Sequence, residues 1–371
     1  MTMNFPILSK RVLLVPALLL TAMTLSCRKD KTEIPTGLPI PPDPTGVSVD
    51  LTQVPYPKLS DYRFFEGDMK DQNPAEGVLP YEPITQLFTD YALKKRFVWM
   101  PNGTKANYVS DTEILDLPVG SAIIKTFYYD NMLPENATRI LETRIMIRKS
   151  TGWIFAEYEW NDEQTEAYLN MDGVNKSISW VQNGTPMSTN YRLPSDTECM
   201  ICHKFNASPI PIGIKPQHLN KSLQYADGEM NQLQKWVSVG YLNGPLPSNI
   251  LTVVDYKDES KSLRDRVRSY LDMNCAHCHQ ENSHCDYRPM RLAFSETELS
   301  LNLGICVDPE EFIDASLVSI IVPGNTSKSM MHFRLGSTEE SNRMPLLGRT
   351  VVHQEGLALL TAFIQSLTNC D

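Results

Sequence analysis

The sequence predicts a multidomain α+β fold, in which an N-terminal antiparallel β domain, sandwich-like, precedes mainly α-helical domains. The first observation is a change of pattern at Pro194, where short β-rich runs give way to apolar residues at helical spacing. The second is size, since 371 residues, of which 42% are hydrophobic, suffice for two or three domains with cores. The third is charge: 44 acidic against 34 basic residues exclude a chain that binds nucleic-acid phosphates.

The N-terminal segment predicts export and a membrane tether. Two basic residues precede the apolar run Val12–Leu25, which is too short to span a membrane and is typical of a signal peptide. The segment that ends in Cys27 resembles a bacterial lipoprotein box, so we expect a lipoprotein signal peptide at 1–26 and a lipid on Cys27. A plain secretory signal is the alternative. The prolines of residues 27–59 then predict an extended tether, which leaves the protein lipid-anchored to a bacterial membrane and facing the periplasm or cell surface.

Residues 60–194 are expected to form the β-rich domain. Segment 149–152 has the composition of a hairpin turn between two of its strands. All seven histidines lie at position 203 or later, and no cysteine lies between Cys27 and Cys199. We therefore do not expect a copper, zinc or haem site built wholly from this domain, and we interpret the run Arg96–Met100 as core packing. The strands are predicted at 122–129, 139–148 and 153–160.

Helices are expected after Pro194. Apolar residues recur on one face of 258–271 and again of 357–367, and a further helix is predicted within 228–242, with Gly240 near its end.

Two copies of the motif C-x-x-C-H carry the chemistry. Cys199, Cys202 and His203 form the first, and Cys275, Cys278 and His279 form the second. In an exported protein this motif is typical of covalent c-type haem attachment, in which the two thiols bond the haem vinyl groups and the histidine binds the iron. We therefore predict two covalently attached c-type haems, with His203 and His279 as iron ligands.

Two other interpretations of the motif are weaker. A thioredoxin-like redox pair needs neither a second copy nor the adjoining histidine. A zinc site would have to join two cysteine pairs across the long segment between Cys202 and Cys275, which is not a zinc-ribbon spacing.

The order of helix, motif, methionine and helix predicts a class I cytochrome c-like domain at 256–371. Met344, which follows His279 in this order and precedes the last predicted helix, is the expected second axial ligand and so a metal ligand. Met330, Met331 and His332 are rivals in the same segment.

The first motif is assigned to an atypical haem unit at 195–255, because the chain before Cys199 is extended rather than helical. His218 and Met230 are its candidate distal ligands, and an open or water-bound iron is the third alternative.

Three cysteines remain after haem and lipid are assigned. In an oxidising compartment the economical pairing joins Cys285 to Cys306, with Cys306 to Cys370 as the alternative.

The chain resembles a family of bacterial di-haem c-type cytochromes that carry a β domain ahead of two C-x-x-C-H units. The resemblance covers nearly all of residues 60–367 and implies haem binding and electron transfer outside the cytoplasm. Cys285 and Cys370 lie outside the family's pattern. The segments that carry the resemblance are Leu87–Ala92, Thr126–Tyr129, Trp160–Thr165, Asn231–Leu233, Tyr270–His279 and Met344–Pro345.

These observations favour an electron-transfer protein over a catalyst, and no catalytic residue is assigned. The expected partners are a redox protein and, through the lipid, the membrane. The net charge of −10 would attract a redox protein that has a basic surface. Nucleic acid is excluded as a partner. The alternative is a di-haem peroxidase-like enzyme, or another haem oxidoreductase that uses an open first haem. A surface binding module is a third hypothesis, in which the β domain grips a polymer or protein.

Overall fold

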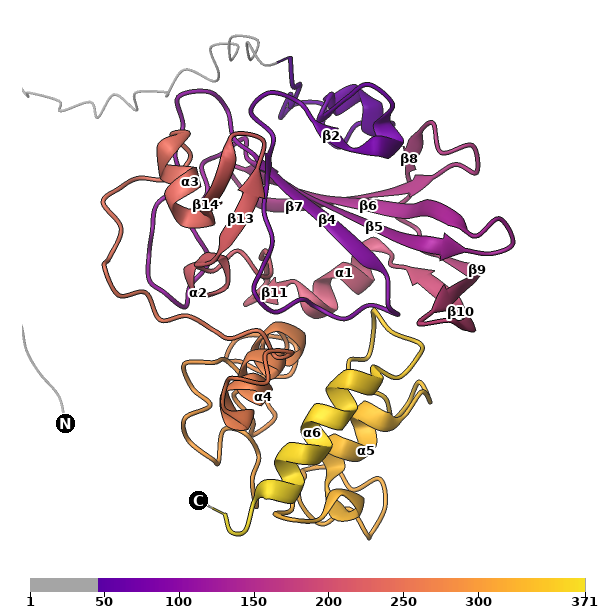
Figure 1. Ribbon diagram of the computed structural model, residues 1–371, viewed down its shortest axis with the longest axis vertical. Coiled ribbons are helices and arrows are strands. Elements are labelled where there is room, and N and C mark those ends of the chain that lie inside the picture. The colour runs from indigo at the N-terminus through magenta and orange to yellow at the C-terminus, as the bar shows by residue number, and fades with distance from the viewer. Residues whose placement is uncertain (1–45, 371) are drawn as a thin grey trace, which may run out of the picture. The chain divides into compact units, whose positions relative to one another are not determined.

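The computed structural model describes residues 46–370, and their largest sheet is an antiparallel one of eight strands (Figure 1). The strand order is β10-β9-β5-β6-β7-β8, and β4, with β3 on its far side, also pairs with β5. Strand β9 meets β5 through the single pair Met132 and Trp180. The strands are β3 (Leu79–Pro80), β4 (Leu93–Trp99), β5 (Ala122–Met132), β6 (Ala137–Lys149), β7 (Gly152–Trp160), β8 (Ala167–Leu169), β9 (Val174–Gln182) and β10 (Thr185–Leu193).

The three predicted strands are confirmed as β5, β6 and β7, and so is the hairpin between the last two. Lys149 pairs with Gly152, which leaves two residues in the turn.

Both faces of the sheet are buried, and among residues 46–370 the other sheets have only two strands, so neither face is covered by a sheet of comparable size. One face packs against residues of the 47–78 segment, among them Val47, Leu59 and Tyr62. The opposite face shares a core with Ile214 and Trp236 from the segment that follows the first motif. The predicted sandwich is therefore wrong, and residues 47–59, which the sequence assigns to the tether, pack on the sheet.

The predicted helical cytochrome c-like domains are also wrong. The fold is mainly β, with 27% strand against 19% helix, and most helices are short. They are α1 (Asp196–Cys202), α2 (Pro216–Leu219), α3 (Gln232–Ser238), α4 (Leu263–Leu271), α5 (Met330–Gly336) and α6 (Gln354–Ser366); the 3₁₀ turns are Leu59–Tyr62, Met69–Asp71 and Thr326–Lys328, and a π turn covers Asp272–Ala276. Paired short strands are β1 (Phe65–Glu66) with β2 (Asn73–Pro74), β11 (Lys204–Phe205) with β12 (Ser208–Pro209), and β13 (Ser222–Tyr225) with β14 (Gly228–Asn231).

Local capping explains why the helices are shorter than the segments in which apolar residues recur at helical spacing. Helix α4 begins later than the predicted range because the Ser262 side chain caps it by accepting the backbone N–H of Asp265. Helix α3 ends at Ser238, just before Gly240, which adopts a left-handed φ of 81°. Between residues 280 and 325 the chain is held by turns and isolated bridges instead of helices. Helices α4 and α6 still contact each other, and their apolar faces enter one core.

The disulfide joins Cys306 to Cys370, so the pairing of Cys285 with Cys306 is wrong. Cys285 is a buried free thiol. The predicted signal peptide and the lipid on Cys27 lie outside the described residues. Within residues 46–370, no helix combines the length and the apolar character that crossing a bilayer requires.

Candidate functional site

Helix α1 presents the first motif. Ser195 caps the helix by a capping box, in which its side chain accepts the N–H of Glu198 and the Glu198 carboxylate accepts the N–H of Ser195 at 2.7 Å. Arg192 of strand β10 pairs with Glu198 at 2.8 Å and ties the helix start to the sheet. The cap fixes a short helix that begins only after the extended chain, and both cysteines of the motif lie on it.

His203 follows the helix and has one ring nitrogen free for a metal. Its Nδ1–H donates to the carbonyl oxygen of Ile210 at 2.9 Å, which leaves the lone pair on Nε2. Burial lowers the pKa of His203 to about 4, so the ring is neutral at pH 7. Burial also raises the pKa of the Cys199 thiol to about 11. A neutral imidazole with an oriented ring is the form that binds iron.

The second motif starts in the π turn that follows α4, and Asp272 anchors this turn. Its buried carboxylate accepts hydrogen bonds from Gln217 Nε2 at 3.3 Å, from the backbone N–H of Phe294 at 2.8 Å, and from His218 Nε2. Burial would raise the pKa of Asp272, but Lys215, 3.8 Å away, and His218 hold it well below its usual value. His218, a candidate distal ligand of the first haem, is therefore the partner of a carboxylate.

His279 and Met344 line the same cavity. The space, including its mouth, measures about 770 Å³, and Cys275 forms another part of its wall. Burial lowers the pKa of His279 to about 4, and its Nδ1 has no hydrogen-bond partner among the described residues. Met330 and Met331 line this cavity as well, whereas His332 bonds Thr361 at 2.9 Å and does not line it.

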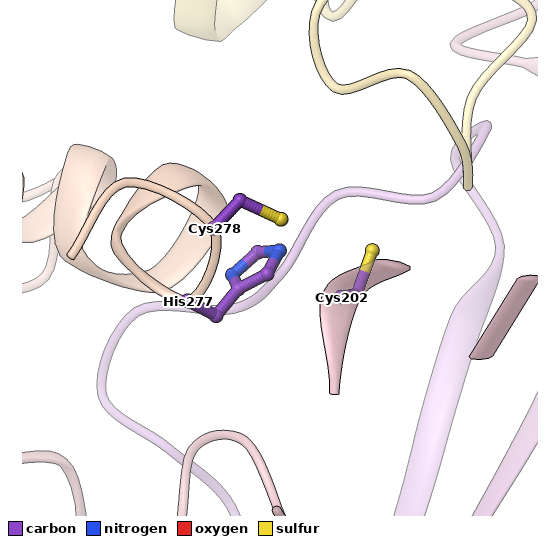
Figure 2. A group of neighbouring side chains, drawn as sticks. All are labelled: Cys202, His277 and Cys278. Carbon is purple, nitrogen blue, oxygen red and sulfur yellow. The ribbon is translucent and has the colours of Figure 1, made fainter. Parts of the chain in front are cut away.

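The structure brings the two motifs together. The ligand atoms of Cys202, His277 and Cys278 all lie within 4.8 Å of one another, although the two cysteines are far apart in the sequence (Figure 2). Figure 2 shows both thiols and the ring converging on one point. The hydrogen bond from Cys278 lowers the pKa of Cys202, with help from His277, and raises that of Cys278. The spacing argument against a shared thiolate site therefore fails, because the fold closes the distance.

A larger cavity lies against the first motif. It measures about 1350 Å³ with its open mouth, and Cys199, Cys202 and His203 line it. Met146 of strand β6 and Met273 and His277 of the second motif's segment also line it. Neither His218 nor Met230 lines it, and Met230 is 38% exposed on strand β14.

The residues present fit two covalent haems. Cys199, Cys202 and the neutral His203 line the first cavity, and Cys275 and the neutral His279 line the second, so each motif presents a thiol and a histidine to a space beside it. Apolar side chains such as Ile123 and Phe155 in the first cavity, and Leu271 and Leu335 in the second, suit a macrocycle. The orphaned Nδ1 of His279 and the free Nε2 of His203 are both nitrogens able to bind a metal.

Sequence reasoning missed the charged wall of the first cavity. Arg96, Lys125, Arg144 and Glu157 line it from four neighbouring strands of the sheet. The sequence places Arg96 in a packing run, and it is buried, but its guanidinium also faces this space. The signal was present: charged residues inside otherwise apolar strand runs.

The segment Leu87–Ala92, which contributes to the family resemblance, joins the sheet to the C-terminal residues. The buried carboxylate of Asp90 accepts the backbone N–H groups of Thr350 and Val351 at 2.6 and 3.0 Å. The Phe88 ring stacks on His353 at 4.0 Å.

Comparisons of the chain with protein-family models, with curated proteins and with solved structures found no match.

Proposed function

We propose that the protein is an exported di-haem c-type electron-transfer protein. In this proposal Cys199 and Cys202 attach one haem, Cys275 and Cys278 attach the other, and His203 and His279 bind the two irons. The observation that carries it is the arrangement of the motifs: each has its own cavity, yet they meet at Cys202 and Cys278.

The meeting of the two motifs supports transfer between two centres. Haem, when bound, supplies an iron that takes up and releases one electron. Because the sulfurs of Cys202 and Cys278 lie within 4.8 Å, the chain would hold its two attachment points as neighbours. Such closeness favours exchange of an electron within the molecule.

The protein's own residues orient the iron ligands. The hydrogen bond from His203 Nδ1 to Ile210 fixes its ring, and Met344, which lines the same cavity as His279, would be the second residue to hold the second iron. The Arg349 guanidinium, which is 2% exposed, holds the Met344 segment by donating to the carbonyl oxygens of Met344 and Arg334, each at 2.9 Å. A thioether ligand would raise the potential of the second haem relative to a second histidine.

The test is the intact mass of the protein produced in a host that matures c-type haem. We expect the mass of two haems in the parent and of one haem in each double variant, Cys199→Ala/Cys202→Ala and Cys275→Ala/Cys278→Ala. Cys285→Ala is the matched control, since this buried thiol belongs to neither motif, and it should keep both. A parent without covalent haem, or double variants that keep both haems, would overturn the proposal.

A second candidate is a metal site formed by Cys202, His277 and Cys278, which their convergence favours. Two thiolates and an imidazole suit zinc, with a fourth position left for water or substrate. The two candidates exclude each other, because a thiol bonded to haem is no longer a thiolate. His277→Ala separates them: it should abolish stoichiometric zinc in the haem-free protein under the second candidate, but leave the mass of two haems intact under the first.

A further inference from the structure

Three basic side chains form a row across the sheet at the first cavity. Arg96 of β4 lies directly opposite Lys125 of β5, and Lys125 lies directly opposite Arg144 of β6. Directly paired residues of antiparallel strands share one face, so the three cations point the same way, and all three line the cavity that contains Cys199 and His203. Like charges in such positions repel each other and need compensation.

The available carboxylates do not balance this row. Glu142 and Glu157 both pair with Arg144, at 2.6 and 3.1 Å. Among residues 46–370, neither Arg96 nor Lys125 takes part in an ion pair within 4.0 Å, and Nη1 of Arg96 is buried without a hydrogen-bond partner. The ring of Phe127 lies 5.0 Å from Lys125 Nζ but carries no negative charge.

The unfavourable position of these cations lowers their pKa values. Burial lowers the pKa of Lys125 well below its usual value, and the neighbouring Arg96 lowers it further. Burial also lowers the pKa of Arg96, which is 6% exposed. A buried guanidinium beside a half-buried ammonium, neither of them in an ion pair among the described residues, is rare unless an anion occupies the space in front of them.

We propose that Arg96 and Lys125, with Arg144 beside them, bind a pair of carboxylates in the first cavity, and that these are the propionate groups of the haem attached to Cys199 and Cys202. The inference rests on the proposed function. Haem carries two carboxylates, and attachment to Cys199 and Cys202 would place it in the cavity that these cations line. A guanidinium and an ammonium side by side can each pair with one of them.

The test compares three holo variants that each lose one positive charge, and a fourth that keeps it, in a potentiometric titration. Arg96→Gln and Lys125→Gln each remove one cation from the row. Lys95→Gln is the matched control, because Lys95 is exposed on the other face of β4, where it lies opposite Thr126. We expect all three to keep the mass of two haems. In the first two, one midpoint potential falls, because losing a nearby cation stabilises the oxidised, more positive centre. Lys95→Gln leaves both potentials unchanged, and Lys125→Arg restores the parent value.

A second arm distinguishes haem carboxylates from a free anion and needs no variant. Succinate and inorganic phosphate are titrated into the holoprotein, and we expect neither to shift a potential, because the row is already occupied. A saturable shift would show that the row is open and overturn the inference. Equal potentials in Lys125→Gln, Arg96→Gln and Lys95→Gln, with two haems present, would also overturn it while the proposed function stands. Absence of covalent haem in the parent would overturn both.

Discussion

Replacing Asp272 with asparagine should destabilise the protein strongly, because this carboxylate joins the turn of the second motif to two other segments. It is buried and accepts hydrogen bonds from Gln217, His218 and the backbone of residue 294. Asparagine keeps one oxygen, which can still accept the backbone N–H. That oxygen also keeps a bond from Gln217, whereas the amide N–H group takes the place of the oxygen that accepts from His218, so the bond from His218 and the negative charge would be lost.

The magnitude follows from the bonds that are lost. A hydrogen bond to a charged group contributes about 1.5–3 kcal/mol, so the loss of the bond from His218 alone costs about that much. Breaking a buried charged pair by removing one partner costs about 3–5 kcal/mol, which sets the upper end of the expected loss.

The pH dependence of stability gives a second, independent test of the role of Asp272. The folded-state pKa of Asp272 lies below its usual value of 3.8. Its contribution to stability is therefore complete above pH 3.8, and is lost as the pH falls from there toward the lowered pKa. The asparagine variant has no such contribution to lose. The difference in stability between the parent and the variant should shrink as the pH falls below about 4.

Urea denaturation of the two proteins between pH 3 and pH 7 measures both effects. Asp286→Asn is the control: an exposed aspartate in the same part of the chain, it should change the free energy of unfolding by less than about 0.5 kcal/mol. A loss below about 1 kcal/mol for Asp272→Asn at pH 7, or a difference that grows as the pH falls, would refute the role of the carboxylate.

Three further predictions follow from other contacts. Replacing both Cys306 and Cys370 by alanine removes a disulfide that joins residues 64 positions apart. In the chain-entropy account this should lower the free energy of unfolding by about 4 kcal/mol. An unchanged urea midpoint would contradict the prediction. Asp90→Ala leaves two backbone N–H groups without their acceptor. It should lower the free energy of unfolding by about 2–4 kcal/mol and speed proteolysis near residue 350. Cleavage at the parent's rate would contradict this prediction. In the holoprotein, Met344→Leu should lower the potential of the second haem whereas Met331→Leu should not; the reverse pattern in a redox titration would assign the ligand to Met331.

The central strands could be predicted because their apolar residues are dense and continuous. In β5, Ile123 enters the core on one face of the sheet and Ile124 enters the core on the other. Short β-rich runs suggested two packed sheets, and double burial does require a cover on both faces. The covers are instead the segments 47–78 and 214–242, each built from short helical turns or helices and a two-stranded pair, whose apolar residues follow no single period. Periodicity therefore reveals the sheet but not what lies on it.

Only the two motifs of the site, each formed by residues adjacent in the sequence, could be predicted. Each motif is a short run of neighbouring residues, and its geometry depends on the turn that holds it. The neighbouring positions of Cys202 and Cys278 depend on how distant segments pack, which spacing along the chain does not report. The row from Arg96 to Lys125 depends on strand register, and shifting the pairing by one residue would turn these side chains to the opposite face.

The first cavity also bears on whether the β region is a separable module. Every cysteine and histidine of the candidate site lies after residue 198, yet the sheet supplies a wall of the cavity through Arg96, Ile123 and Phe155. A chain that lacks residues 60–194 would expose His203, the proposed iron ligand, whose ring packs edge-on against Phe155 at 5.5 Å. Solvent would then reach the haem proposed for this cavity, and the basic row would be gone. Deleting the sheet should therefore change the first centre rather than leave it unaltered, which argues against a β domain that acts only as an independent binding module.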